Sequence, residues 1–98
     1  MLSFSQKVLE FLNNIPVGRV VTYAMIASAI GHPKASRAVG NALNANPQPI
    51  KIPCHRVVMS SGRPGGYVYG TAKKIDLLRQ EGVVFANGRV ERRFLLKF

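Results

Sequence analysis

A single cysteine, Cys54, stands in the segment Pro53-Cys54-His55-Arg56 and is the side chain best suited to covalent chemistry in this sequence. A thiol reacts as its thiolate, and a nearby base or positive charge increases the thiolate population. His55 and Arg56 supply both kinds of neighbour. Adjacent side chains of an extended segment point in opposite directions, so only a turn or a helix start brings the imidazole beside the sulfur. Pro53 restricts the backbone and favours such a turn.

The Cys-His pair taken alone is weak evidence for chemistry. A lone cysteine in a small intracellular domain is more often a buried packing residue. One cysteine makes no internal disulfide, and its free thiol fits a reducing compartment. One Cys and two His do not form a zinc site at a recognised spacing, so we expect no metal, and His32 is interpreted as a turn residue.

The charge of the chain points to a polyanionic partner. The 98 residues carry 14 Lys and Arg against 4 Asp and Glu, a formal net charge of +10. No acidic residue lies between positions 11 and 75. Self-repulsion in such a segment is tolerated best when a polyanion binds it, and nucleic acid is the commonest one. Some small proteins are simply basic, so charge alone does not decide the matter.

Four helices are expected to position the cysteine. Ser3 and Gln6 form a capping-box pattern before apolar residues at helical spacing up to Ile15. Thr22 is suited to cap a helix over 23–30, and a turn containing Gly31 and Pro33 leads to another over 34–44. This pair matches the helix-turn-helix pattern. The fourth helix is expected from a Thr71 cap to Glu81.

The cysteine itself falls in a loop-rich stretch over 45–70, where proline and glycine are frequent. So long a stretch with little regular structure is unusual in a compact domain and is usually functional. Beyond the fourth helix, Asn87-Gly88 between short apolar runs predicts a β-hairpin. The prediction is one domain over 1–98, mainly α: a winged-helix-like three-helical DNA-binding domain with a helix-turn-helix, a long active-site loop and a C-terminal β-hairpin.

Nearly the whole chain resembles the C-terminal, DNA-binding domain of the O6-alkylguanine-DNA alkyltransferase family. The segment Pro53-Cys54-His55-Arg56-Val57, with Arg37-Ala38-Val39-Gly40 upstream at this spacing, is highly specific for it. Further matching pieces are Thr22-Tyr23, Pro33-Lys34-Ala35-Ser36, Asn46-Pro47, Ser61-Gly62, Gly66-Tyr67, Lys74 and Leu77-Leu78-Arg79-Gln80-Glu81-Gly82.

The resemblance implies a mechanism and a partner. Cys54 is then the nucleophile that takes the alkyl group from guanine O6, His55 removes its proton through a water, and Glu81 stabilises the imidazolium. Asn46 fixes the turn beside the cysteine. Double-stranded DNA containing O6-alkylguanine is the expected partner, bound through its minor groove with the base flipped out. The protein is the acceptor and is consumed, with no cofactor or metal.

The remaining positions follow from the same resemblance. Tyr23 rotates the phosphate and donates to the purine, and Arg37 fills the gap left in the base stack. Without the resemblance, Tyr23 is equally well a half-buried ring, and Arg37 a solvated helix charge. The other expected substrate-binding residues are Leu43, Val57, Tyr67, Val68, Tyr69 and Lys74. The other expected DNA-binding residues are Lys34, Ala35, Ser36, Ala38, Gly40 and Ser60.

Two features depart from the family pattern. Many members carry a separate N-terminal domain that these residues do not contain. In this respect the chain resembles the short alkyltransferase-like proteins, which bind alkylated guanine without repairing it. Those proteins usually have tryptophan at the cysteine position, whereas Cys54 is present here. Many members also continue Ser-Gly-Gly after the tyrosine, where this chain has Val68-Tyr69-Gly70. Tyr69 in place of glycine is expected to narrow the alkyl pocket.

Three hypotheses remain: a single-turnover alkyltransferase, a non-catalytic lesion-binding protein that recruits another repair pathway, and a winged-helix regulator. Cys54 with His55 and Glu81 favours the first. The small side chains of the helix over 34–44 disfavour a regulator, which reads bases with longer ones. No apolar run is long enough to span a membrane and no signal peptide is evident, so we expect the protein in the cytoplasm, or in the nucleus of a eukaryote. We also expect it to be a monomer.

Overall fold

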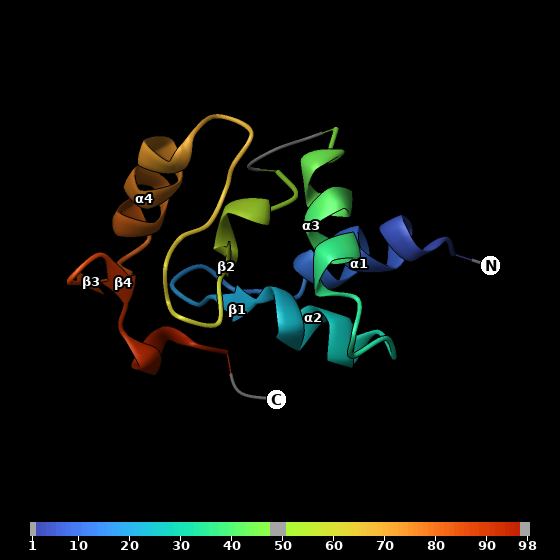
Figure 1. Cartoon of the computed structure of the whole chain (residues 1–98). Coiled ribbons are helices and arrows are strands. Elements are labelled where there is room, and N and C mark those ends of the chain that lie inside the picture. The colour runs from blue at the N-terminus through green and yellow to red at the C-terminus, as the bar shows by residue number, and fades with distance from the viewer. Residues whose placement is uncertain (1, 48–50, 97–98) are drawn as a thin grey trace.

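The computed structural model describes residues 2–47 and 51–96, and helices form most of its regular structure (Figure 1). The α-helices in these ranges are α1 (Phe4–Leu12), α2 (Tyr23–Ala29), α3 (Ser36–Asn44) and α4 (Thr71–Gln80). The strands are β1 (Val21–Thr22), β2 (Val57–Val58), β3 (Phe85–Ala86) and β4 (Arg89–Val90), and the short 3-10 helices are η1 (Cys54–Arg56) and η2 (Arg92–Phe94). The mainly α expectation is confirmed.

Two short parallel strands lie between the two halves of the molecule (Figure 1). Val21 of β1 pairs with Val57 of β2, two segments far apart in the sequence. Neighbouring side chains of a strand point to opposite faces, so Val57 packs with α1, α2 and α3 while Val58 packs with α4 and the hairpin. Cys54 belongs to the first of these clusters. The β1–β2 pair therefore holds the cysteine segment against both halves of the core.

The predicted caps of the first two helices are confirmed. The Ser3 hydroxyl accepts from the Gln6 backbone amide, and the Ser3 backbone amide donates to the side-chain oxygen of Gln6, which makes the capping box. The Thr22 hydroxyl accepts from the Met25 amide at 3.0 Å, so α2 begins at Tyr23. The first helix ends earlier than predicted, at Leu12, because the chain turns there and Ile15 is buried from a loop instead.

The helix-turn-helix is present, with a longer connection than predicted. Helix α2 ends at Ala29 and α3 begins at Ser36, not at residue 34. The His32 carbonyl accepts from the Ala35 amide, which closes a turn around Pro33 instead of a first helical turn. Val39, Ala42 and Leu43 of α3 are buried. The opposite side of this helix is left at the surface.

The stretch over 45–70 is mostly loop, as predicted, but it contains η1 and β2; residues 48–50 of it lie outside the described ranges. Helix α4 follows Gly70, whose positive φ of 92° lets the chain enter the helix without a side-chain cap. Thr71 is thus the first helical residue and not the predicted cap. The predicted hairpin is confirmed, with Asn87 and Gly88 both at positive φ in its turn.

None of the helices in the described ranges has the length and apolar character needed to cross a bilayer.

Candidate active site

The 3-10 turn η1 supplies the turn that the sequence required at the cysteine. The Cys54 amide donates to the Ile52 carbonyl at 2.7 Å, and the Arg56 amide donates to the Pro53 carbonyl. The side chain of Asn46 donates to the same Ile52 carbonyl at 2.9 Å. Asn46 thereby ties the end of α3 to the residues before the cysteine, as expected of the residue that fixes this turn.

A cavity of about 640 Å³ opens beside the cysteine, a size typical of sites for small organic groups. Cys54 is 5% exposed and lies in its wall, so the sulfur is covered by protein except on the cavity side. The wall is built from α2, α3 and the loop after β2. Its predicted members are Tyr23, Ser36, Arg37, Gly40, Leu43, Cys54, Ser60, Tyr67 and Val68.

Other predicted residues lie outside this wall. Val57 is fully buried in the core beside Val21, so it supports the site from behind instead of lining it. Tyr69 is 56% exposed and packs edge-on against Tyr67, with ring centroids 5.6 Å apart. The predicted DNA-binding residues that do not line the cavity are Lys34, Ala35 and Ala38.

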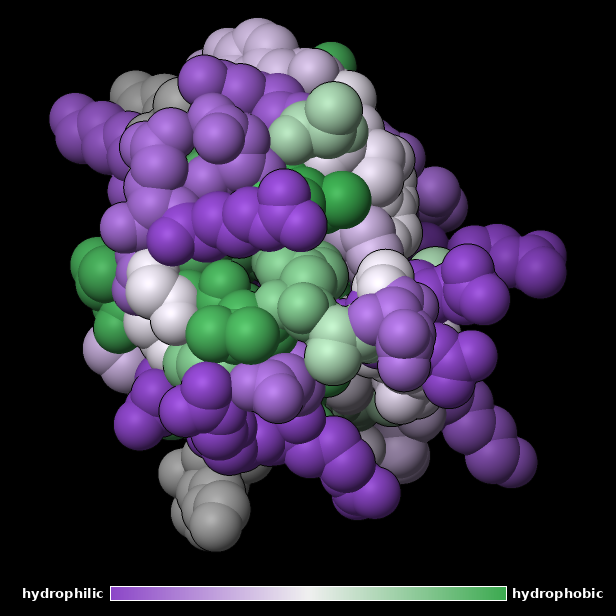
Figure 2. All heavy atoms as spheres, turned by 90° about the vertical axis from the view of Figure 1, so that its left-hand side faces the viewer, coloured by the Kyte–Doolittle hydropathy of each residue, from purple (hydrophilic) through white to green (hydrophobic). Residues whose placement is uncertain are grey.

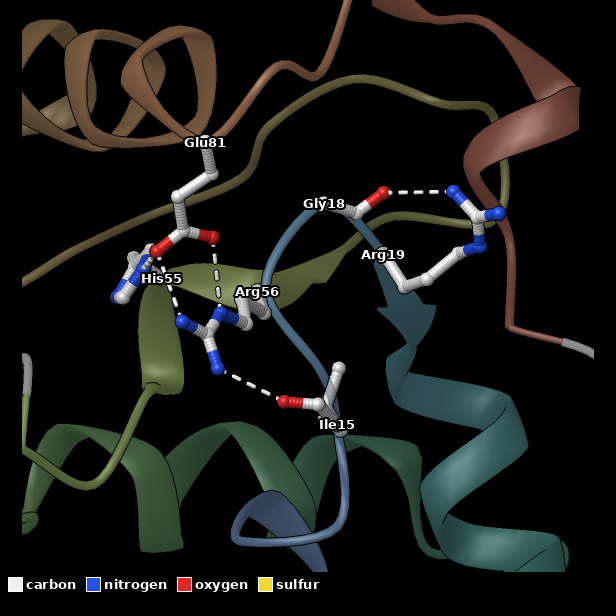
Figure 3. A network of polar contacts seen from close by, with 6 residues as sticks. All are labelled: Ile15, Gly18, Arg19, His55, Arg56 and Glu81. Atoms are coloured by element: carbon white, nitrogen blue, oxygen red, sulfur yellow. Dashed lines mark hydrogen bonds and ion pairs between the residues drawn. The ribbon is translucent and has the colours of Figure 1, made fainter.

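Behind the wall, the carboxylate of Glu81 joins α4 to η1 (Figure 3). His55 Nε2 lies 2.8 Å from Glu81 Oε2. Arg56 donates from Nε and Nη2 to the two carboxylate oxygens, each at 2.9 Å, and its Nη1 donates to the Ile15 carbonyl at 2.7 Å. The predicted His55–Glu81 contact is therefore present, together with a bidentate arginine that the sequence did not reveal.

This contact fixes the protonation of His55. Burial opposes the Glu81 charge, but hydrogen bonds from Arg56 and His55 outweigh it and lower the pKa of the carboxyl. A carboxylate only accepts, so Nε2 carries the hydrogen and Nδ1 presents a free lone pair. Burial lowers the pKa of His55 despite Glu81, which keeps the imidazole neutral. Nδ1 is buried and makes no hydrogen bond with any of the described residues.

The thiol is also neutral at rest. Burial raises the pKa of Cys54, against the opposing effects of the Asn46 hydrogen bond and the Lys74 charge. A neutral thiol beside a neutral imidazole needs proton transfer before it attacks. Burial likewise raises the pKa of Tyr23, so its hydroxyl stays a hydrogen-bond donor.

Lys74 is a buried cation directly behind the cavity wall. It is 1% exposed, and its Nζ donates to the Gly66 carbonyl at 3.1 Å. The same ammonium lies 5.8 Å from the centroid of the Tyr23 ring. Burial lowers its pKa to about 8, while the Cys54 charge acts in the opposite direction. Lys74 therefore holds the loop after β2 and places positive charge near the sulfur.

Sequence reasoning missed several contributors to the site. Arg56 was interpreted as a charge beside the thiol, whereas its guanidinium is engaged by Glu81. Met59 lines the cavity although it is 45% exposed, an unusual exposure for a large apolar side chain. A Cβ at Gly65 would lie 3.0 Å from the Tyr23 hydroxyl oxygen, so this glycine permits the close approach of loop and tyrosine. No sequence pattern pointed to either of these last two.

The fold and the site define a small helix-turn-helix domain with a buried thiol next in sequence to an imidazole that is hydrogen-bonded to a carboxylate. The family model "6-O-methylguanine DNA methyltransferase, DNA binding domain" matches residues 3–83. The chain belongs to this family.

Relatives of known identity agree with that assignment. The methylated-DNA–protein-cysteine methyltransferase of Homo sapiens is 51% identical over 81 residues, 82% of this chain and 39% of that protein. The bifunctional transcriptional activator/DNA repair enzyme Ada of Escherichia coli is 49% identical over 79 residues, 81% of this chain and 22% of that protein. The chain thus spans well under half the length of these two relatives.

Solved structures give two different comparisons. Mycobacterium tuberculosis OGT in complex with DNA has a TM-score of 0.79 and 44% identity, covering 83% of this chain and 50% of that one. S. pombe Atl1 in complex with damaged DNA containing O6-carboxymethylguanine has a TM-score of 0.82 and 30% identity, covering 99% of both chains.

The buried ammonium predicts a specific pH dependence of stability. Lysine in the unfolded chain holds its proton up to about pH 10.5, whereas folded Lys74 releases it near pH 8. Between these values the unfolded state binds more protons, so the contribution of Lys74 to stability rises with pH. The full difference corresponds to about 3 kcal/mol. Urea unfolding of wild type and Lys74→Met should show the wild type gaining on the variant from pH 8 to 10.5. If the free energies of unfolding of the two proteins changed in parallel with pH over this window, the burial of the Lys74 ammonium would be contradicted.

Proposed function

We propose that the protein repairs DNA by accepting an alkyl group, typically methyl, from O6 of guanine onto Cys54. The observation that carries the proposal is the buried thiol in a cavity wall, followed in the chain by a His55 that is hydrogen-bonded to an ionised Glu81. Relatives that share about half of the matched residues are named methylated-DNA–protein-cysteine methyltransferases. A structural neighbour named OGT was solved in complex with DNA.

The transfer is a single displacement. His55 Nδ1 takes the thiol proton through a bound water, and the sulfur attacks the alkyl carbon. The new S–C bond forms as the C–O6 bond breaks, and the electron pair leaves with the guanine. Glu81 stabilises the imidazolium, and a proton returned to the base completes the balance. A thioether has no easy leaving route, so each molecule acts once, without cofactor or metal.

The DNA side of the proposal uses α3 and Tyr23. A guanine inside a duplex must leave the stack before its O6 group reaches the cavity, at a cost of a few kcal/mol. The small residues Ala35, Ser36 and Ala38 let the start of α3 approach the minor groove closely. Arg37, in the cavity wall, fills the space left by the flipped base. Lys34 and Ser60 contact the backbone phosphates of the double-stranded DNA.

The cavity wall then holds the base. Tyr23 stays protonated and donates to the purine, while Leu43, Tyr67 and Val68 contact its faces and edges. Lys74 fixes the loop that forms one side of this pocket. We propose that the protein acts as a monomer over residues 1–98, in the cytoplasm or, in a eukaryote, the nucleus.

A second candidate function is lesion binding without transfer. It is favoured by the Atl1 structure, which resembles this chain over 99% of both lengths and contains damaged DNA. In that case Cys54 is vestigial and the flipped base signals to another repair pathway. The presence of Cys54 together with the His55–Glu81 pair favours transfer, because a protein that only binds the lesion has no use for a proton acceptor beside a cysteine.

Mass spectrometry separates the two functions. Incubation with a duplex containing O6-methylguanine should add one methylene to the mass of the protein, and peptide mapping should locate it on Cys54. Cys54→Ala should bind the same duplex and gain no mass, because it keeps the cavity and lacks the acceptor. Tight binding by wild type without any mass gain would reject transfer in favour of lesion binding.

The loop after Tyr67 predicts a preference for small groups. Tyr69 supports the Tyr67 ring from outside the cavity, which limits how far the wall yields to a bulky substituent. Wild type should transfer methyl faster than benzyl, and Tyr69→Gly should raise the benzyl rate relative to the methyl rate. Tyr69→Phe keeps the ring contact and is the matched control. Equal methyl and benzyl rates in wild type would contradict the proposed limit.

A further inference from the structure

A second cavity, of about 480 Å³, lies between the turn after β2 and the C-terminal hairpin. We call it the arginine groove. Arg89 of β4 and Arg92 of η2 supply its charge, and Thr22, Ser60 and Ser61 supply hydroxyl groups. No acidic residue lines it in the described part of the chain. Its lining is therefore cationic and rich in hydrogen-bond donors, which is what an anionic ligand requires.

The two arginines are free to bind a ligand. Both are exposed, and neither makes an ion pair or hydrogen bond through its side chain with any residue in the described ranges. Arg93, the middle residue of η2, does make such contacts. Its guanidinium pairs with Glu91 at 3.0 Å and lies over the Phe94 ring. The carboxylate nearest in sequence, Glu91, is thus already paired with another arginine.

The groove adjoins the candidate active site. Met59, Ser60 and Ser61 line both cavities, so the two share one wall formed by the turn after β2. Figure 2 shows the side of the molecule that carries α4 and the hairpin, where hydrophilic side chains surround a small apolar patch.

The hairpin is held rigidly against that shared wall. The Val90 amide donates to the Gly62 carbonyl at 2.8 Å, and the Gly62 amide donates to the Met59 carbonyl. A Cβ at Gly62 would lie 3.2 Å from Arg89 Cβ, so only glycine lets the hairpin approach this closely. The backbone of the hairpin at Arg89 and Val90 is consequently held against the turn that lines both cavities.

We propose that the arginine groove binds backbone phosphates of the same DNA strand next to the flipped nucleotide, as a contact separate from α3. This inference rests on the proposed function, since it assumes that a base enters the first cavity. Guanidinium groups bind phosphate oxygens in pairs of parallel hydrogen bonds, and serine hydroxyls add further donors.

Salt dependence of binding tests the proposal. Anisotropy titrations of a duplex with O6-methylguanine are made with wild type, Arg89→Gln/Arg92→Gln, and the control Lys7→Gln/Lys73→Gln, which removes the same charge at exposed residues outside the groove. Each phosphate contact contributes about 0.9 to the slope of log K against log salt. The groove variant should lose about 2 from this slope, and the control should keep the wild-type value.

A second readout shows that the groove variant still has an intact active site. Its methyl transfer from the free base O6-methylguanine, which has no phosphate, should equal that of wild type. If the double variant is unfolded, the single variants Arg89→Gln and Arg92→Gln decide, each with an expected loss of about 1 in slope.

Three outcomes overturn the proposal. Equal slopes for the groove variant and wild type reject a phosphate contact there while leaving the proposed function intact; an acidic protein partner for the groove would give this result. Equal losses in the groove variant and the control show only a general charge effect. A wild-type protein that binds no alkylated duplex rejects both this inference and the proposed function.

Discussion

The carboxylate of Glu81 is the contact on which the arrangement of the site depends. It receives two hydrogen bonds from Arg56 and one from His55, while Arg56 also donates to Ile15. These contacts join three segments that are distant in sequence: the loop after α1, the turn η1 and the end of α4. A negative charge near a helix C-terminus is unfavourable for the helix dipole. The arginine offsets that cost, and removing one partner of such a largely buried pair typically costs about 3–5 kcal/mol.

Burial shifts the pKa values of the cysteine and the histidine in opposite directions, and both shifts favour the neutral form of the side chain. It raises the pKa of Cys54 and lowers that of His55, so both are neutral in the free protein. A neutral thiol is a weak nucleophile, and the sulfur is exposed only toward the cavity. Lys74 and Asn46 lower the cost of forming the thiolate there. The site thus combines a protected thiol with the groups that favour its charged form.

The sequence predicted the elements with strong local signals and missed those made by distant pairing. The Ser3 and Thr22 caps and the Asn87-Gly88 turn depend on neighbouring residues, and the structure confirms them. The Val21–Val57 pairing involves two-residue strands without a pattern of their own, so it was not predicted.

The same distinction applies to the site. Cys54, His55 and Glu81 came from a motif that spans the chain, and the structure brings His55 and Glu81 together. The engagement of Arg56 by both oxygens of Glu81, the exposure of Met59 and the contact of Gly65 with Tyr23 depend on how distant loops meet. Such contacts depend on how segments that are distant in sequence pack together, and no short sequence pattern predicts that packing.

The central claim is that the Glu81 charge acts on Cys54 through His55. The most direct measurement is the single-turnover rate of methyl transfer by Glu81→Gln at saturating alkylated duplex, with Glu91→Gln as the control for charge. Proton-transfer catalysis is typically worth about 10²–10⁴-fold, so the Glu81 variant should be slower by about 100-fold or more, with DNA affinity equal to that of the control. A Glu81→Gln protein that folds, binds the duplex and transfers methyl at the wild-type rate would contradict the account.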